Sequence, residues 1–533
     1  MRTALSISFL VGCTGGPAGG DTLPGEESWR FALEPVLPLN QSELFSAVTT
    51  LELRVEAAGA EPVVYTWEDA ARGAEARFPG LDDLAGATLD LRGYDAGGTL
   101  LARGRTAPID ASAGAVPEPV PIFLAGVERV GVLGDLASER VFGRVIADGA
   151  GGFLLLGGTT NGVTTREDAV DDVARLDLLN PEPNLAFQSG FSALPPVGNN
   201  AFPGRAGFTA TPLSRSGDAG QVLISGGTAD GVDAFNVGDD LFLLDPLSGA
   251  TTPLDDAYLP DPLYHHTATE DAEGRVIFVG SISGGTGSPT TLYFDTTAAV
   301  YDPVNRRTDN IGVGSASGAF LHHGAARLGD DGVLACGGAD LTGSNTFEIL
   351  VACDLFSRAG VTPLEGNGQK LLLPTMYHAM ATLPDGRVLS AGGVSASSEV
   401  DDNTALSATA AVFAFDGDQW APLGELAVPR AMHTLVPLPD GRFLVAGGVT
   451  RTRGLFWDSR DAIGCVEIFD PTTGTGTILG TCDVADGTGS LPLPVSMPMV
   501  AVDPSLGVLI VGGLDTDDNA STGVAFVGLP PAD

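Results

Sequence analysis

Short apolar runs, each ending at or near a pair of glycines, recur along most of the chain. Seven of them can be recognised: "GGFLLLGG" ending at Gly158, "GQVLISGG" at Gly227, "GRVIFVGS" at Ser281, "DGVLACGG" at Gly338, "DGRVLSAGG" at Gly393, "DGRFLVAGG" at Gly448 and "LGVLIVGG" at Gly513. The steps between them are about 53 to 70 residues long, a period typical of repeat architectures. The pattern therefore predicts one structural unit repeated seven times.

Each unit predicts four short antiparallel strands. In the sixth unit, "HTLVPL", "RFLVAGG", "GCVEIFD" and "TILG" are separated by stretches rich in Pro, Asp, Gly and Thr, which form turns. Four such strands cannot bury both faces alone, so the units must stack on one another. Stacked radially, they close into a β-propeller with protected edges. The glycine pair is expected near the crowded centre, where close backbone approach and positive φ exclude a side chain.

The order of the strands also predicts how the ring closes. Residues 132–145, "VLGDLASERVFGRV", align with residues 422–435, "PLGELAVPRAMHTL", which span a fourth strand and the next first strand. Residues 128–134 therefore form a fourth strand with no partners before it, and the last unit provides only three strands. We predict that the early strand completes the last unit, which gives a propeller of seven blades over residues 127–533.

Two further segments precede the repeats. In residues 28–126, alternating stretches such as "TTLELRVEAAG" and a turn at residues 95–98 predict about seven short strands, typical of a small Ig-like β-sandwich. The first residues, "MRTALSISFLVGC", have the layout of a signal peptide. We expect a lipoprotein signal peptide over residues 1–12 and a flexible Gly/Pro tether over residues 13–27.

The string "LVGC" resembles a bacterial lipobox, in which Cys13 becomes lipidated. Because Thr14 rather than Asp follows this cysteine, the resemblance implies an outer-membrane lipoprotein of the cell envelope. The other four cysteines allow three pairings. The two local ones, Cys336–Cys353 and Cys465–Cys482, are expected as disulfides in an oxidising compartment, and four buried free thiols are the alternative.

Charge narrows the choice of partners. The chain of 533 residues carries 67 acidic and 27 basic side chains, a formal net charge of −40. Such a surface repels phosphate, which argues against nucleic acid as a partner.

Several positions of the repeat match a known family. They are the glycine pairs, Pro429-Arg430 before a first strand, Tyr301-Asp302 and Phe469-Asp470 in third strands, and Trp420 in a fourth strand. Over about 400 residues the chain resembles the kelch repeat, and its style is similar to bacterial kelch proteins and to the central domain of galactose-oxidase-like proteins. The resemblance implies a kelch-type propeller.

The six histidines share one register. His266, His323, His378 and His433 each lie 14 residues before the first position of the glycine pair, and His265 and His322 are their neighbours. Imidazole is a common copper or zinc ligand. One histidine per blade is nevertheless expected to be spread around the ring and to make a repeated structural hydrogen bond.

A galactose-oxidase-like copper site would need two histidines, a tyrosine and a tyrosine crosslinked to a cysteine. Tyr264 beside His265 and Tyr377 beside His378 are candidates for it. Because all the cysteines of the repeats are placed for local pairing, we expect no copper. The acidic stretch "DTDDN", residues 515–519, offers oxygen ligands for calcium, although no complete calcium-loop pattern is present. The expectation is no cofactor, with calcium as a weak alternative.

The long loops after the second strands are the expected recognition surface. The loop of the sixth unit, "VTRTRGLFWDSRD" over residues 449–461, is basic and aromatic, and its Arg451, Arg453, Trp457 and Arg460 form the predicted binding patch. Alternatively, Trp457 only packs over the blade edge.

No catalytic motif is found. The sequence thus predicts a lipid-anchored, non-enzymatic binding or scaffold protein that recognises a protein or glycan at the cell envelope. The alternative is a carbohydrate-active or copper-dependent oxidase enzyme of galactose-oxidase-like architecture.

Overall fold

The computed structural model describes residues 33–531, except 42, 58, 69–85, 110–119, 163–168, 182–191, 194–201, 216–217, 230–235, 281, 287–290, 295–296, 315–320, 344–345, 456–457 and 486. The predicted signal peptide, Cys13 and the tether lie outside this part of the chain. Within it the fold is all-β, as predicted, with one short 3-10 helix, η1 (Leu44–Ala47). None of the described segments is a helix long and apolar enough to cross a membrane.

The N-terminal region forms a six-stranded sheet in the order β1-β6-β5-β4-β2-β3. Its strands are β1 (Leu33–Val36), β2 (Thr50–Glu56), β3 (Val63–Glu68), β4 (Thr88–Tyr94), β5 (Leu100–Arg105) and β6 (Val120–Gly126). The alternating apolar residues of β2, among them Leu51 and Leu53, pack with Leu89 and Ile122 in one core. The described strands thus belong to one sheet, where the sequence predicted the two layers of a sandwich.

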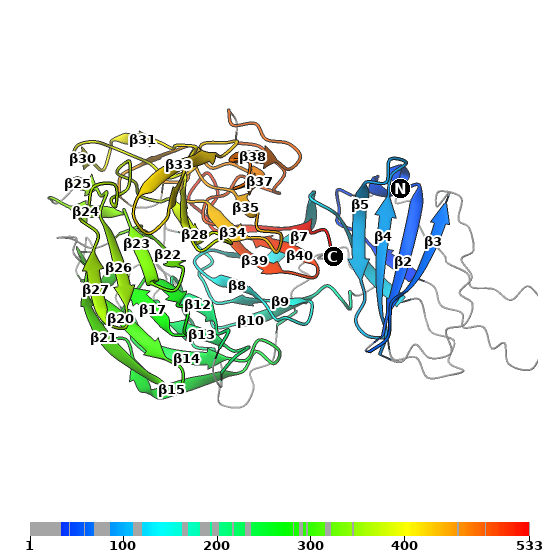
Figure 1. Cartoon of the computed structure of the whole chain (residues 1–533), viewed down its shortest axis with the longest axis horizontal. Coiled ribbons are helices and arrows are strands. Elements are labelled where there is room, and N and C mark those ends of the chain that lie inside the picture. Colours follow the sequence, from blue (N-terminus) through cyan, green and yellow to red (C-terminus); the bar gives the residue numbers. More distant parts are fainter. Residues whose placement is uncertain are drawn as a thin grey trace, which may run out of the picture.

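The remaining strands group into four-stranded antiparallel blades around a ring, shown in Figure 1. Blade 1 contains β8 (Arg144–Ala147), β9 (Gly152–Leu156), β10 (Val173–Asp177) and β11 (Ser192–Ala193). Blade 2 contains β12 (Thr209–Pro212), β13 (Val222–Ser225), β14 (Asp240–Leu244) and β15 (Thr251–Tyr258). Blade 3 contains β16 (Thr267–Glu270), β17 (Val276–Val279), β20 (Thr297–Asp302) and β21 (Arg307–Val313). Blade 4 contains β22 (Gly324–Leu328), β23 (Gly332–Cys336), β26 (Cys353–Ser357) and β27 (Gly360–Pro363).

Three more blades follow. Blade 5 contains β28 (Ala379–Thr382), β29 (Val388–Ala391), β32 (Ala411–Phe415) and β33 (Trp420–Glu425). Blade 6 contains β34 (Thr434–Pro437), β35 (Phe443–Ala446), β37 (Val466–Asp470) and β38 (Thr475–Ile478). Blade 7 contains β39 (Met499–Asp503), β40 (Gly507–Val511), β41 (Ser521–Gly528) and β7 (Val130–Arg140). The first strand of every blade contacts the first strand of the next, and β39 contacts β8. The described strands therefore close into a seven-bladed propeller.

Closure occurs where the sequence predicted it. Strand β7 pairs antiparallel with β41, with Val130 opposite Val527 and Gly134 opposite Val524. The earliest strand of the propeller is therefore the outermost strand of the last blade, and the prediction is confirmed. This pairing covers the edge that β41 would otherwise expose and makes the last blade four-stranded like the others.

In six of the seven blades, all but blade 3, a glycine pair joins the second strand to the next blade. In blade 5, the N–H of Gly393 donates to the carbonyl of Arg430 in blade 6 at 2.8 Å, and Gly392 and Gly393 have φ of +66° and +93°. A Cβ on Gly392 would lie 2.4 Å from the same carbonyl oxygen, and one on Gly393 would lie 2.8 Å from the carbonyl oxygen of Met376. Both positions therefore need glycine, because contacts on each side leave no room for a side chain.

Short strands in the loops between second and third strands form a further layer on one face of the ring. They are β18 (Ile282–Thr286), β19 (Thr291–Phe294), β24 (Ala339–Leu341), β25 (Thr346–Ile349), β30 (Val400–Asp401), β31 (Ala405–Ser407) and β36 (Arg451–Arg453). Strand β25 of blade 4 pairs with β30 of blade 5, and β31 of blade 5 pairs with β36 of blade 6. Loops of adjacent blades thus support one another above the ring.

The N-terminal sheet packs against blade 7, on the right of the ring in Figure 1. The rings of Phe123 and Phe526 meet edge to face with centroids 5.2 Å apart. The Arg103 guanidinium donates to the carbonyl of Ser505 at 2.9 Å, and the N–H of Leu39 donates to the carbonyl of Val132 at 2.8 Å. Apolar and backbone contacts together hold the sheet to the blade that closes the ring.

The contact at the first glycine gives a direct test. We expect Gly392→Ala to destabilise the fold by about 3 kcal/mol or more, because it combines a strained φ with a clash against backbone. Gly417→Ala is the matched control: its φ is also positive, but nothing lies within 4 Å of the added Cβ, so the expected loss is about 1 kcal/mol. Urea unfolding of both variants measures the difference. Equal losses would show that packing at the blade junction is not what requires glycine.

Candidate functional site

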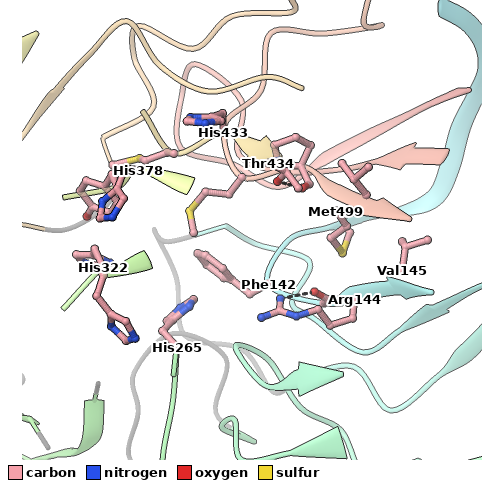
Figure 2. Close-up of a pocket in the computed structure, with 16 residues that line it drawn as sticks. Phe142, Arg144, Val145, His265, His322, His378, His433, Thr434 and Met499 are labelled. Carbon is pink, nitrogen blue, oxygen red and sulfur yellow. Dashed lines mark hydrogen bonds between the residues drawn. The ribbon is translucent and has the colours of Figure 1, made fainter. Parts of the chain in front are cut away.

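A cavity of about 360 Å³ lies at the centre of the propeller, where the first strands begin. It is lined by Phe142, Gly143, Arg144, Val145, His265, His322, His323, Tyr377, His378, Met432, His433, Thr434, Met497, Pro498, Met499 and Val500. Figure 2 shows these side chains arranged around a common space. None of them is acidic, although the chain as a whole carries a net charge of −40.

The side chains that lie innermost occupy a strained backbone position. We call this the rim position; it is held in the seven blades by Phe142, Gly207, His265, His322, Tyr377, Met432 and Met497. All seven have positive φ, between 50° and 64°. The N–H of one rim residue donates to the carbonyl of the rim residue in the preceding blade, for example Met497 to Met432 at 2.7 Å and Met432 to Tyr377 at 3.0 Å. Large residues rarely adopt this conformation, which is typical of functional sites.

The next residue in each blade occupies what we call the histidine position, and the residue after it the following position. The histidine positions are Gly143, Phe208, His266, His323, His378, His433 and Pro498. The following positions are Arg144, Thr209, Thr267, Gly324, Ala379, Thr434 and Met499. At five of the junctions the following residue lies beside the histidine position of the next blade: Arg144–Phe208, Thr209–His266, Thr267–His323, Gly324–His378 and Thr434–Pro498. By its place in the repeat, Ala379 corresponds to these residues at the junction with His433.

In two blades this pairing gives the Nε2 atom of the histidine a hydroxyl partner. His266 Nε2 is hydrogen-bonded to the hydroxyls of Thr209 at 3.2 Å and Ser225 at 3.0 Å. His323 Nε2 is hydrogen-bonded to the hydroxyl of Thr267 at 2.9 Å. At these junctions the repeated structural hydrogen bond expected from the sequence is present.

The same support is missing for His378 and His433. The preceding blades place Gly324 and Ala379 at the following position, and neither has a hydroxyl. Both ring nitrogens of His378 and of His433 are buried without a hydrogen-bond partner among the described residues, and the two side chains are only 6% and 8% exposed. Buried polar groups left unsatisfied cost stability, so they mark places where a ligand can supply the missing bonds.

Burial keeps the imidazoles uncharged. Desolvation, aided by repulsion from neighbouring cationic groups, lowers the pKa of His378 and of His433 to about 3. Burial likewise lowers the pKa of His322 to about 3 and holds that of His265 well below its ordinary value. A neutral imidazole has one N–H donor and one acceptor nitrogen, so it can either donate a hydrogen bond to a hydroxyl group or accept one from it.

Tyr377 ties the cavity to the loop that carries the predicted binding patch. Its hydroxyl donates to the carbonyl of Leu455 at 2.5 Å, and Leu455 is buried. The loop over residues 449–461 therefore reaches inward to the cavity wall. Burial raises the pKa of the Tyr377 hydroxyl well above its ordinary value, so it stays protonated.

The predicted patch itself is not a free cationic surface. Asp458 accepts from Arg453 at 3.3 Å and from Arg460 at 2.8 and 2.9 Å, which braces the loop internally. Arg451 is exposed on β36. Trp457 lies outside the described residues. The two paired arginines thus stabilise the loop that contacts Tyr377.

The other predicted site residues have structural surroundings. Disulfides join Cys336 to Cys353 and Cys465 to Cys482, each across 17 residues. In the acidic stretch over residues 515–519, the Asp515 carboxylate accepts the N–H groups of Asp517 and Asn519 at 2.8 and 2.9 Å, as in a capped turn.

Comparison with known proteins identifies the fold but no family. No protein-family model matches the chain, and no curated protein does. A fungal alcohol oxidase of the AA5 family, solved in complex with copper, is similar with a TM-score of 0.51 and 15% identity, covering 75% of this chain and 78% of that one. The structure of YjhT is similar with a TM-score of 0.42 and 14% identity, covering 64% of this chain and 98% of that one. The chain thus shares its fold with the fungal alcohol oxidase.

These findings correct three predictions from the sequence. A non-enzymatic binding or scaffold role, the absence of enzyme activity and the absence of a cofactor were expected. They are overturned by the oxidase, which has this fold and holds copper. The alternative that the sequence also offered, an enzyme of galactose-oxidase-like architecture, agrees better with this likeness.

The described residues nevertheless do not fit copper. They contain no group of three or more His, Cys, Asp or Glu side chains placed to hold a metal ion. The four cysteines of the propeller are joined in disulfides, so none is free for a crosslink to a tyrosine. The cavity histidines are distributed over blades 3 to 6 rather than gathered at one point. We therefore derive no step through a metal.

Sequence reasoning found the histidine register but missed its meaning. First strands are innermost in a propeller, so a residue repeated at their start faces the central channel from every blade. Five of the six histidines line one cavity for this reason, whereas the sequence predicted that they would be dispersed without a shared site. The site could have been predicted from the sequence by noting that Gly324 and Ala379 stand where blades 2, 3 and 6 have threonine.

The buried histidines predict a pH-dependent stability. Below pH 6.5 the unfolded chain binds protons that the folded chain does not accept until about pH 3, so stability falls as the pH drops. Each such histidine contributes up to about 1.4 kcal/mol per pH unit. We expect urea unfolding between pH 6.5 and 4.5 to show this loss, and His433→Gln to lessen its slope. Parallel slopes for the variant and the parent would contradict the burial of a neutral His433.

Proposed function

We propose that the protein is an enzyme that acts on a small hydroxyl-bearing molecule, a monosaccharide or polyol, bound in the central cavity. The observation that carries the proposal is the pair of buried, unpartnered imidazoles of His378 and His433. A substrate hydroxyl placed against each ring would supply the hydrogen bonds that Thr209 and Thr267 supply elsewhere in the ring.

The size and lining of the cavity support this class of substrate. Its volume of about 360 Å³ lies in the range of small-molecule sites. Met432, Met497 and Met499 provide apolar contact, while imidazoles and the Arg144 guanidinium provide a few polar groups that fix orientation. A sugar presents the same combination of apolar C–H faces and directional hydroxyls.

The chemistry that these residues supply on their own is proton transfer. A neutral imidazole accepts a proton from a hydroxyl through one nitrogen and donates one through the other. The imidazoles of His378 and His433 both line the cavity, so each can exchange a proton with a different oxygen of the substrate. An alcohol oxidase has the same fold, which agrees with a hydroxyl-bearing substrate.

The test follows the interconversion of anomers, starting from anomerically pure monosaccharides, by NMR in deuterated buffer. In this reaction the anomeric hydroxyl loses a proton, the bond between the anomeric carbon and the ring oxygen breaks, and the ring oxygen gains a proton, so no oxidant is needed. We expect His378→Gln and His433→Gln to lower kcat/KM by about a hundredfold, because each removes a proton-transferring group. His266→Gln is the matched control: it occupies the same position in its blade but does not line the cavity. Unchanged rates in both cavity variants, or no turnover of any panel member by the parent, would sink the proposal.

A second variant separates hydrogen bonding from packing. Ala379→Thr should give His433 the internal hydroxyl partner that His323 has in Thr267, and Ala379→Val has the same shape without the hydroxyl. We expect the threonine variant to be about 1 kcal/mol more stable than the valine variant and to bind substrate more weakly. Equal stability and equal affinity of the two would argue that His433 is already satisfied.

We further propose that the enzyme works at the cell envelope, anchored by a lipid on Cys13. The two disulfides support export, since such bonds persist in oxidising compartments. We expect Cys13→Ala to move the protein from the membrane fraction to the soluble fraction. Retention of this variant on membranes would refute the anchor.

A further inference from the structure

Arg144 is the one charged residue among the seven at the following position. It stands where blades 2, 3 and 6 have threonine, and its guanidinium carbon lies 5.7 Å from the centre of the Phe208 ring in the next blade. The pair Arg144–Phe208 thus replaces the Thr–His pair found at other junctions. The attraction between a cation and an aromatic face holds the guanidinium at the cavity wall.

Among the described residues, no carboxylate forms an ion pair with this cation. Arg144 donates one hydrogen bond to the carbonyl of Gly143 at 2.8 Å and forms no ion pair with any described residue. Burial lowers the pKa of Arg144 to about 10, so the side chain stays charged at neutral pH. In a chain with 67 acidic side chains, a partly buried cation without an acidic partner among the described residues is an unusual arrangement.

The other arginines near the junctions behave differently. Arg140 pairs with Asp172 at 2.6 Å, and Arg430 lies 3.5 Å from Glu467 with both side chains fully buried. The fold therefore supplies acidic partners where an arginine serves the blade itself. At Arg144 none of the described side chains plays this part, which leaves the cation available to a molecule that enters the cavity.

We infer that the substrate of the proposed enzyme carries a carboxylate and is therefore a sugar acid, with Arg144 as the group that binds its acid end. This inference rests on the proposed function. The planar guanidinium matches a carboxylate through two parallel N–H···O bonds. Figure 2 draws Arg144 and His378 on opposite sides of the cavity, so an acid bound at Arg144 extends its hydroxyls toward the histidines.

The single charge favours a carboxylate over a phosphate. A phosphate carries nearly two negative charges and is usually held by several donors, such as the backbone N–H groups of a helix N-terminus. The cavity wall offers one cation, and no helix N-terminus contributes to the described lining. The site is thus matched to a monoanion.

The experiment compares acids with their neutral parents. Isothermal titration uses D-galacturonate against D-galactose, D-glucuronate against D-glucose, and galactose 6-phosphate as the phosphate arm. For the parent protein we expect each acid to bind about tenfold to a hundredfold more tightly than its neutral sugar. Arg144→Gln should abolish this preference of acid over neutral sugar, and Arg144→Lys should keep part of it.

The outcomes separate the two proposals. Acids and neutral sugars that bind or react equally well in the parent and in Arg144→Gln would overturn the sugar-acid inference and leave the hydroxyl-directed enzyme intact. Tighter binding of galactose 6-phosphate than of galacturonate would also overturn it. Loss of acid preference in Arg144→Gln, with the thermal unfolding midpoint retained and the histidine variants inactive on both sugar types, would support both proposals.

Discussion

One hydrogen bond between neighbouring blades governs the architecture. The N–H of the second glycine in a pair donates to a carbonyl just before the first strand of the next blade, at 2.7 Å from Gly158 to Arg205 and 3.1 Å from Gly513 to Arg140. The bond forms only if the backbone has positive φ and the first glycine has no side chain. Each blade thereby fixes the position of the next one, and the rim residues are brought together around a common axis.

Because the backbone is the same in each blade, blades differ at these positions only in their side chains. The blades share one geometry at the rim and histidine positions, so a threonine in one blade and an alanine in another are directly comparable. Where Thr267 is present, His323 is satisfied within the protein. Where Ala379 replaces it, His433 keeps its hydrogen-bonding capacity for something else. The proposed site thus lies at the blade junctions where the repeated threonine is absent.

Much of the fold could be predicted from the sequence because the repeat is strong. The glycine pairs gave the period, and the alignment of residues 132–145 with 422–435 gave the closure through β7 and β41. The site was harder to predict, because its residues are separated by about a blade each and none of them forms a local motif. Arg144 lies in the first blade and His433 in the sixth, and only the ring places them around one cavity. The loop patch stays a prediction, and the sequence did not indicate that Asp458 would pair with two of its arginines, Arg453 and Arg460.

The pairing of β7 with β41 has a consequence for how the chain matures. Thr522 and Asp135 are hydrogen-bonded across 387 residues of sequence, so the earliest strand of the propeller, β7, must wait for its last strand, β41. Until then β7 has no partner in its blade, and the cavity lacks the wall that blade 7 contributes. A chain interrupted before β41 therefore has neither a closed ring nor a formed pocket. Because such distant pairings form slowly, the time between translation and ring closure is when this protein is most vulnerable to proteases and chaperone capture.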